Sequence, residues 1–222
     1  WLESQTREFR AGVEIVAMDG FAGFKSATAE AVPDATAVMD PFHVVALAGD
    51  KMNQTRQRVQ RELTGGRGRR DDPLYKARRL LHTGIGLLTE RQNTRLDALF
   101  ATDDHVEVEI TWSVYQNIIA AYRNPDRTAG RTALSRLIDA IKTGVPKGLE
   151  ELAQLGRTLH KRRADILAFF DHPGTSNGPT EAINGRLEHL RGIALGFRNL
   201  ANYRLRSLLE AGGFRPLLHS FL

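Results

Sequence analysis

The sequence predicts an α/β protein that is mostly helical, and two observations lead to this fold class. Residues 13–19 and residues 35–40 are short apolar runs, rich in β-branched side chains, and each ends in an aspartate. Near-continuous apolar runs of this length are typical of parallel strands that are buried on both faces. From His43 to Asp171, in contrast, apolar residues recur at helical spacing. We therefore expect a small parallel sheet joined to a large helical region.

The two predicted strands and the segment between them indicate a βαβ unit. Residues 25–32 are compatible with a helix, which ends at Pro33 because the residue before a proline disfavours helical backbone angles. A crossover of this kind brings Asp19 and Asp40 to the same carboxyl edge of the sheet. In open α/β sheets this edge is where ligands bind.

The helical region is predicted to contain six segments: residues 42–63, 75–82, 90–100, 106–122, 133–143 and 148–170. In the fourth of them Trp112, Tyr115, Ile119 and Tyr122 recur at helical spacing, which favours core packing over a cofactor site. The loop at residues 65–70 is rich in glycine and arginine. It lacks the lysine and hydroxyl spacing of a phosphate-binding loop, so it offers little support for nucleotide binding.

A further helix begins near Pro179, which suits a first helical turn, and places Glu181 close to the helix N-terminus. The helix dipole favours a carboxylate there, so two interpretations stay open: Glu181 caps the helix, or it belongs to a site. One face of the helix is predicted to be a buried stripe formed by Ile183, Leu187, Leu190 and Ala194. A second face carries Glu181, Asn184, Glu188 and Arg191. Amide and guanidinium groups continue in residues 196–199, and they favour the site interpretation.

Composition limits the class of protein. The chain has 31 Lys and Arg against 26 Asp and Glu, a net charge of +5, and no cysteine, which excludes disulfides and thiolate metal sites. No apolar run approaches the roughly 20 residues of a membrane span. Residues 50–100 hold 12 basic and 6 acidic side chains. This excess favours contact with phosphate backbones, although an ordinary solvated surface remains an equal alternative.

The first residues predict an amphipathic helix with Leu2 and Phe9 on its apolar side. A domain boundary rarely falls inside a helix. We therefore expect the chain to be trimmed or to be a fragment of a longer protein.

Two groups of motifs carry a resemblance to a known family. Residues 16–19 with residues 33–45 resemble the core of insertion-sequence transposases of the ISL-three family, and residues 177–184 with residues 196–199 resemble that family's carboxyl-terminal signature. The similarity spans nearly the whole chain. It implies a ribonuclease-H-like core, incomplete at the N-terminus, with a large all-helical insertion before the last acidic residue. The implied divisions are residues 1–62 for the first part of the core, 63–170 for the insertion and 171–222 for the last part.

The resemblance also implies the site residues of a DDE transposase. Asp19 is interpreted as the second acidic residue, because one helix and one strand leave no room for a hairpin between Asp19 and Asp40. Asp40 and His43 match the Asp-x-x-His motif of related transposases, and Glu181 matches the third acid. It remains open whether Asp40 binds metal directly, and whether His43 is instead a core histidine. The first aspartate is expected upstream of Trp1, together with zinc-binding and helix-turn-helix parts, so we expect the 222 residues alone not to cleave DNA.

The implied chemistry uses Mg²⁺ or Mn²⁺. Two ions about 4 Å apart activate a water or a DNA 3′-hydroxyl for in-line displacement at phosphorus. Asp19 and Glu181 are the expected metal ligands and should approach each other closely. The expected contacts to DNA phosphates are Asn184, Arg186, Arg191 and Arg198.

The implied partners are the transposon ends and target DNA, bound by a homodimer or a larger assembly, with no membrane. The implied location is the bacterial cytoplasm, at the nucleoid. An alternative stays open: a catalytically dead remnant that binds DNA or self-associates. A purely helical interaction protein is disfavoured by the two strand-aspartate runs.

Overall fold

The structure is a computed structural model that describes residues 1–66 and 68–211. The chain forms two compact units, Trp1–Thr175 and Ser176–Leu222, and each is described by itself. Helices dominate both units, and a small sheet lies in the first, so the predicted mostly helical α/β class is confirmed. None of the described helices is long and apolar enough to cross a membrane.

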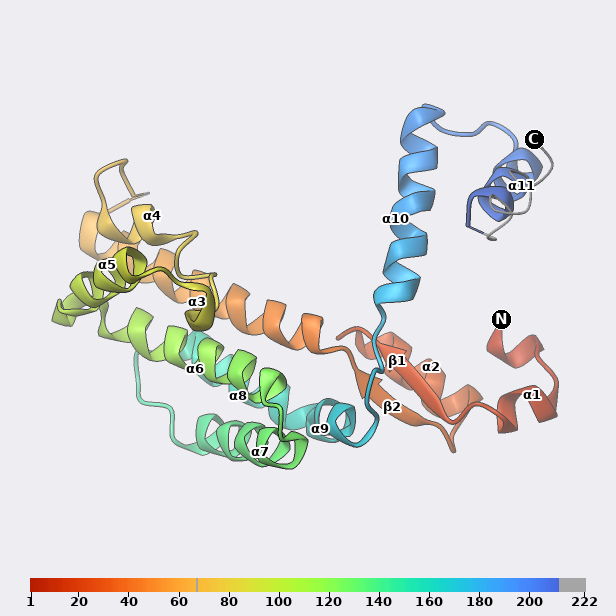
Figure 1. Ribbon diagram of the computed structural model, residues 1–222, viewed down its shortest axis with the longest axis horizontal. Helices are drawn as coiled ribbons and strands as arrows, with labels where there is room; N and C mark the ends of the chain where they lie inside the picture. Colours follow the sequence, from red (N-terminus) through yellow and green to blue (C-terminus); the bar gives the residue numbers. More distant parts are fainter. Residues whose placement is uncertain (67, 212–222) are drawn as a thin grey trace. The chain divides into compact units, whose positions relative to one another are not determined.

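The sheet consists of β1 (Ile15–Met18) and β2 (Thr36–Met39), which pair in parallel. The crossover between them is α2 (Ala22–Ala31), which confirms the predicted βαβ unit (Figure 1). In the register of the pair Ile15 lies opposite Thr36 and Met18 lies opposite Met39.

The prediction that both strands are buried on both faces is wrong for β1. Ile15 is 39% exposed, and Val16 and Ala17 are only half-buried. Within the described residues β1 pairs with a single strand, and the helix α9 (Arg163–Asp171) packs on β2 instead. An apolar run therefore reports strand propensity here, but not the number of layers that cover the strand.

The other helices of the first unit follow in chain order. They are η1 (Leu2–Ser4), α1 (Arg7–Ala11), α3 (Pro41–Thr64), α4 (Pro73–Ala77), η2 (Ile85–Leu87), α5 (Glu90–Phe100), η3 (Asp103–His105), α6 (Val106–Arg123), α7 (Arg127–Thr143) and α8 (Glu150–Lys161). The predictions for α3, α5 and α6 are confirmed to within two residues. Local caps explain this agreement: Asp40 caps α3, and Thr89 with Gln92 forms a capping box at α5. Gly65 ends α3 in the left-handed conformation, with φ of +71°.

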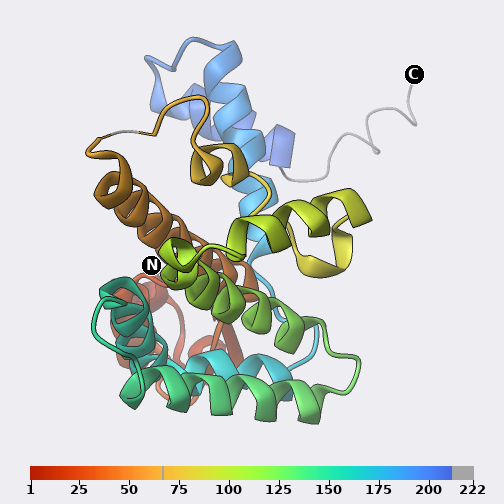
Figure 2. The same cartoon turned by 90° about the vertical axis from the view of Figure 1, so that its left-hand side faces the viewer.

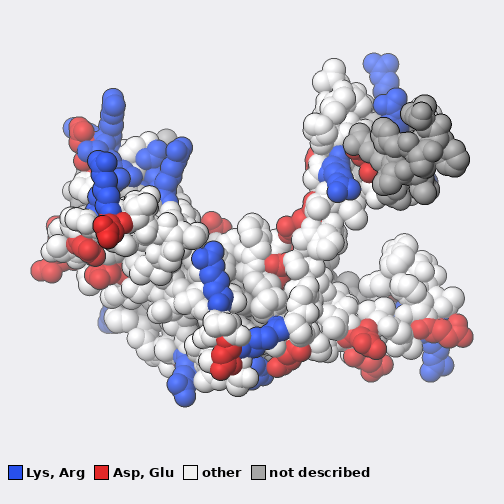
Figure 3. Space-filling model, in the orientation of Figure 1, with Lys and Arg blue, Asp and Glu red and all other residues white. Residues whose placement is uncertain are grey.

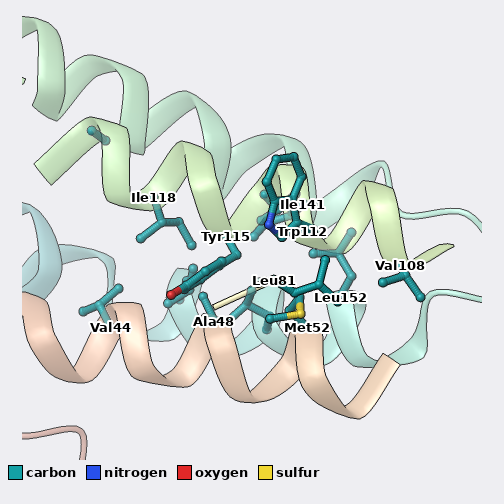
Figure 4. Close-up of a cluster of buried hydrophobic side chains, with 14 of the residues drawn as sticks. Val44, Ala48, Met52, Leu81, Val108, Trp112, Tyr115, Ile118, Ile141 and Leu152 are labelled. Carbon is teal, nitrogen blue, oxygen red and sulfur yellow. The ribbon is translucent and has the colours of Figure 1, made fainter. Parts of the chain in front are cut away.

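The core of the first unit lies between α3, α6, α7 and α8. Figure 4 shows Ala48 and Met52 of α3 on the side of that helix that faces Tyr115 of α6. Trp112 and Tyr115 are buried, so their predicted role in the core is confirmed. The short helices α4 and α5 lie at the end of α3 that is far from the sheet (Figures 1 and 2).

Several predicted helix limits are wrong. The helix expected at residues 148–170 is two helices, α8 and α9, separated at Arg162, whose buried guanidinium binds the sheet edge. The helix expected at residues 75–82 ends at Ala77, after which Leu80 and Leu81 are buried in a turn.

Capping residues explain two further differences. The helix expected at residues 133–143 begins earlier, at Arg127, because Asp126 caps it there. The helix expected at the start of the chain is divided into η1 and α1, because Thr6 accepts a hydrogen bond from Phe9 N–H and caps a separate helix.

The second unit contains α10 (Gly178–Ile193) and α11 (Leu200–Ala211), which pack on each other. The turn between them uses the left-handed conformation at Leu195 (φ 49°) and Gly196 (φ 93°). The predicted buried stripe of α10 is wrong: Ile183 is 40% exposed, and the other stripe residues are at best half-buried. The physical reason is that α11, the one other helix described in this unit (residues 176–211), covers only part of the α10 surface.

Candidate active site

The structure brings Asp19 and Asp40 to the same edge of the sheet. They directly follow Met18 and Met39, which are partners in the parallel register. The last rung of the ladder is a hydrogen bond from Asp40 N–H to the Met18 carbonyl oxygen, at 3.0 Å. The two aspartates therefore leave the sheet at equivalent positions.

The two aspartates also share a local geometry. Asp19 Oδ1 accepts a hydrogen bond from Phe21 N–H at 2.7 Å, and Asp40 Oδ1 accepts one from Phe42 N–H at 2.7 Å. Asp40 is the buried N-cap of α3, whereas Asp19 is half-buried in the turn that leads to α2. Asp40 thus has a structural role at the start of α3, and the Asp19 side chain is the more accessible of the pair.

His43 lies in the first turn of α3, where its N–H donates to the Asp40 carbonyl oxygen at 3.1 Å. Its ring is half-buried and packs edge-on against Phe42, with ring centroids 5.4 Å apart. Asp40 and His43 therefore belong to a single helical turn that is anchored at the sheet edge.

A buried phenol near Asp40 was not predicted as part of the site. Tyr122 stacks on Phe170 with ring centroids 5.4 Å apart, and its hydroxyl is shielded from solvent without a hydrogen-bond partner among the described residues. Burial raises the pKa of Tyr122, and the negative charge of Asp40 raises it further. The sequence identified Tyr122 only as a core residue, because its spacing does not reveal a neighbour from another element.

A second residue that the sequence analysis missed is Arg162, a buried guanidinium behind the sheet edge. Its Nη1 donates to the Gly20 carbonyl oxygen at 3.3 Å, and its Nη2 lies 3.6 Å from the sulfur of Met18. Its Nε donates to Asp165 Oδ2 at 2.7 Å, and Lys25 Nζ binds the same carboxylate at 2.9 Å. Arg162 thus contacts the residues on both sides of Asp19.

One sequence signal does point to Arg162. Leu155, Leu159 and Ile166 form a buried stripe of the α8–α9 segment, and Arg162 occupies the position between the last two at helical spacing. A cation on an apolar stripe is rarely buried without a specific partner. This break in the apolar stripe is the sequence signal that could have identified Arg162.

The remaining predicted site residues lie on the second unit. Glu181 is exposed in the first turn of α10, where its N–H donates to the Asn177 carbonyl oxygen at 3.0 Å. The expected DNA contacts, Asn184, Arg186, Arg191 and Arg198, are all exposed. Asp19 and Glu181 belong to different units, so their closeness stays a prediction.

The signature at residues 196–199 has structural roles in this unit. Gly196 provides the left-handed turn, and Asn199 Oδ1 accepts a hydrogen bond from Ala201 N–H at 2.8 Å at the start of α11. Phe197 packs against Tyr203 with ring centroids 5.1 Å apart. The Asn199 side chain therefore caps α11, so this run has a structural role in addition to the site role that the sequence favoured.

The edge carboxylates have the donor chemistry that a hard divalent cation requires. Mg²⁺ and Mn²⁺ prefer carboxylate oxygens, and Asp19 and Asp40 present two such groups from adjacent strands. Across residues 1–66 and 68–211, no group of three or more His, Cys, Asp or Glu is arranged to hold an ion. The oxygen ligands of Asp19 and Asp40 suit a divalent cation. A complete set of ligands needs at least one further carboxylate.

Comparison with known proteins defines the class. Residues 1–207 match the profile of the DDE transposase family of the ISL-three type, and the chain belongs to this transposase family. It is 30% identical over 210 residues to the transposase for insertion sequence element IS1557 in two strains of Mycobacterium tuberculosis, CDC 1551 / Oshkosh and H37Rv. The alignment covers 85% of this chain and 46% of each relative, so the chain spans about half their length. No solved structure matches the chain.

Proposed function

We propose that the chain is a catalytic part of a DNA transposase that cleaves and joins DNA strands at insertion-sequence ends with divalent metal ions. The observation that carries the proposal is the in-register placement of Asp19 and Asp40 at the carboxyl edge of a parallel pair. Membership of a transposase family supports the reaction class. Strand-end carboxylates of this kind suit metal-assisted phosphoryl transfer.

The proposed fold around this site is a ribonuclease-H-like core with a helical insertion. Residues 1–62 would form the first part of the core, 63–170 the insertion and 171–222 the last part. The parallel βαβ unit supports the core assignment. The helices α6 and α8 pack on α3, and α9 packs on β2, so the proposed insertion shares a hydrophobic core with the first segment.

The residues divide into three proposed roles. Asp19, as the second acidic residue, and Glu181 would hold the ions, which when bound activate the attacking oxygen and stabilise the leaving oxygen. Asp40 and His43 would hold the strand-end turn beside Asp19, and Asp40 would join the ligand set if its buried carboxylate is turned toward the ions. Asn184 and three arginines of the second unit, Arg186, Arg191 and Arg198, would contact DNA phosphates.

The proposed partners are the DNA of the transposon ends and of the target, bound by a homodimer or a larger assembly in the bacterial cytoplasm. Mass photometry with and without a terminal-repeat duplex tests the assembly. A complex that holds a single chain per DNA end pair would contradict it.

The reaction is tested with the protein encoded by the whole reading frame that contains this chain. A labelled terminal-repeat duplex should be nicked with Mg²⁺ or Mn²⁺, and Asp19→Asn and Glu181→Gln should each abolish nicking while DNA binding persists. Calorimetric titration with Mn²⁺ gives a second readout, because both variants should bind the ion more weakly. Asp97→Asn, an exposed carboxylate of α5, is the matched control. DNA binding without any nicking in the unsubstituted protein would support the remnant alternative instead.

A further inference from the structure

A cationic groove lies along α3, in the helical part of the first unit. Two surface hollows, of about 570 Å³ and 440 Å³, share Arg56 and Gln57 in their linings and so adjoin each other. Four arginines line them, and none of the described lining residues is a carboxylate. We call this feature the arginine groove and define it by Arg56, Arg61, Arg78 and Arg79.

The floor of the groove holds a buried positive charge. Arg56 is 5% exposed, and its partners are side-chain amides: Nε donates to Asn53 Oδ1 at 3.0 Å and Nη1 to Gln60 Oε1 at 2.9 Å. The Asp72 carboxylate joins this network through Gln60 Nε2, at 2.6 Å. Amides satisfy the hydrogen bonds of a guanidinium but do not neutralise its charge as a carboxylate does. The Asp72 carboxylate therefore offsets the charge of Arg56 only in part, and the rest adds to the positive charge of the groove.

The walls present further guanidinium groups in defined positions. Arg78 lies 4.2 Å from the centroid of the Tyr75 ring and donates to the Tyr75 carbonyl oxygen at 2.9 Å, so its orientation is restrained. Arg61 and Arg79 are exposed, and Arg61 Nε is held by the Gln57 carbonyl oxygen at 3.1 Å. Figure 3 shows Lys and Arg side chains projecting from the α3–α4 end of this unit.

One glycine, Gly68, lines the groove beside Gln60. Gly68 lies so near Gln60 that a Cβ at this position would overlap the Gln60 side chain. Because the backbone at Gly68 lies close to Gln60, the Gln60 side chain stays between Arg56 and Asp72. It keeps its hydrogen bonds to both residues. The glycine therefore supports the charge arrangement of the floor.

We infer that the arginine groove binds the phosphate backbone of DNA. Guanidinium groups match phosphate oxygens in geometry and charge, and a continuous groove with several of them suits successive phosphates of one strand better than a single small anion. This site goes beyond the proposed function, whose expected DNA contacts all lie in the second unit. It rests on that function only in naming DNA as the polyanion. Four of the 12 basic side chains of residues 50–100 line this groove.

The test compares two pairs of exposed arginines in the whole chain. Arg61→Gln with Arg79→Gln removes two charges from the groove. Arg91→Gln with Arg157→Gln removes two exposed charges from α5 and α8, outside the groove, as the matched control. Fluorescence anisotropy with a duplex of unrelated sequence, titrated with NaCl, gives the affinity and its salt slope. The groove variant should bind about tenfold or more weakly at low salt, with the slope reduced by about two units, and the control should change far less.

Each outcome decides the inference. Equal losses in both variants, or none in either, overturn it, while the proposed function stands if the unsubstituted chain still binds DNA. No binding of any duplex by the unsubstituted chain overturns the groove and the proposed function together. The same arginines could bind duplex RNA or inorganic polyphosphate as tightly as DNA. That result would overturn DNA as the specific ligand and make the groove a general site for polyanions. Circular dichroism and the thermal midpoint confirm that all variants are folded.

Discussion

The guanidinium of Arg162 donates to the carbonyl oxygen of Gly20 at 3.3 Å, although 142 positions separate the two residues. Gly20 follows Asp19, so this contact ties the start of α9 to the turn that carries the candidate catalytic aspartate. Asp165 holds the guanidinium in place through a hydrogen bond of 2.7 Å, and it also binds Lys25. The helical part of the first unit thereby restrains the sheet edge.

Arg162→Gln is expected to lower the free energy of unfolding by about 3 kcal/mol, because it leaves the buried Asp165 carboxylate without its closest partner. Urea unfolding measures the loss. Arg163→Gln is the control, since Arg163 pairs with the half-exposed Asp139 and should cost less than about 1 kcal/mol. Arg162→Lys should recover part of the stability, because lysine keeps the positive charge beside Asp165 but cannot make all the contacts of the guanidinium. Equal costs at positions 162 and 163 would show that Arg162 does not brace the edge.

Tyr122→Phe is expected to leave stability unchanged or to raise it by about 1 kcal/mol. The Tyr122 hydroxyl is buried without a hydrogen-bond partner among the described residues, and a buried hydroxyl of this kind carries an uncompensated desolvation cost. The stacking on Phe170 is kept in the variant. The urea midpoint measures the change, and a loss greater than about 1 kcal/mol would reveal a partner for the hydroxyl.

Stability should fall in mild acid through Glu151. Burial by itself would raise the pKa of Glu151, but hydrogen bonds and charge from Arg58, with a further contribution from Thr55, outweigh it and lower the pKa below its usual 4.5. A depressed carboxyl pKa contributes stability above the unfolded-state pKa, and this is lost as the pH falls through the folded-state pKa. The urea midpoint should therefore drop between about pH 5 and pH 3, and less steeply in Glu151→Gln. Glu90→Gln, at an exposed position of α5, should keep the parent profile; identical profiles for all three proteins would contradict the prediction.

Gly156→Ala should destabilise the first unit by about 2 kcal/mol, because overpacking a close helix contact forces the backbone to shift. A Cβ at Gly156 of α8 would overlap the carbonyl of Ile141 in α7. Gly185→Ala in α10 is the control, since its Cβ would meet open space and alanine favours a helix by up to about 1 kcal/mol. Thermal and urea unfolding measure both. The idea fails if the two substitutions behave alike.

Arg191→Ala should weaken DNA binding regardless of sequence and reduce the salt slope by about one unit, as expected when one phosphate contact is lost. Arg191 forms an exposed ion pair with Glu188 at 2.7 Å. Glu188→Gln should therefore have the opposite effect and tighten binding, because it releases the guanidinium. Salt titration by anisotropy follows both. An inert surface position would leave the slope unchanged in either variant.

Local features were determined by the sequence alone. The limits of α5 follow from the capping box of Thr89 and Gln92, and the start of α3 follows from the capping aspartate Asp40. The strand-end position of Asp19 was equally predictable, because a short β-branched run that ends at a turn needs no distant partner to be recognised. These signals act over a few residues, so they can be read along the chain.

Contacts between distant segments were decided only by the tertiary structure. The break at Arg162 depends on Gly20 and Met18 far along the chain, and the exposure of Ile15 depends on which elements cover β1. The arginine groove likewise exists because α3 and the turn after α4 bring their guanidinium groups together. Sequence periodicity reports which side chains share a face of one element, but the energy of burying a charge or an apolar side chain depends on what the other elements place against that face.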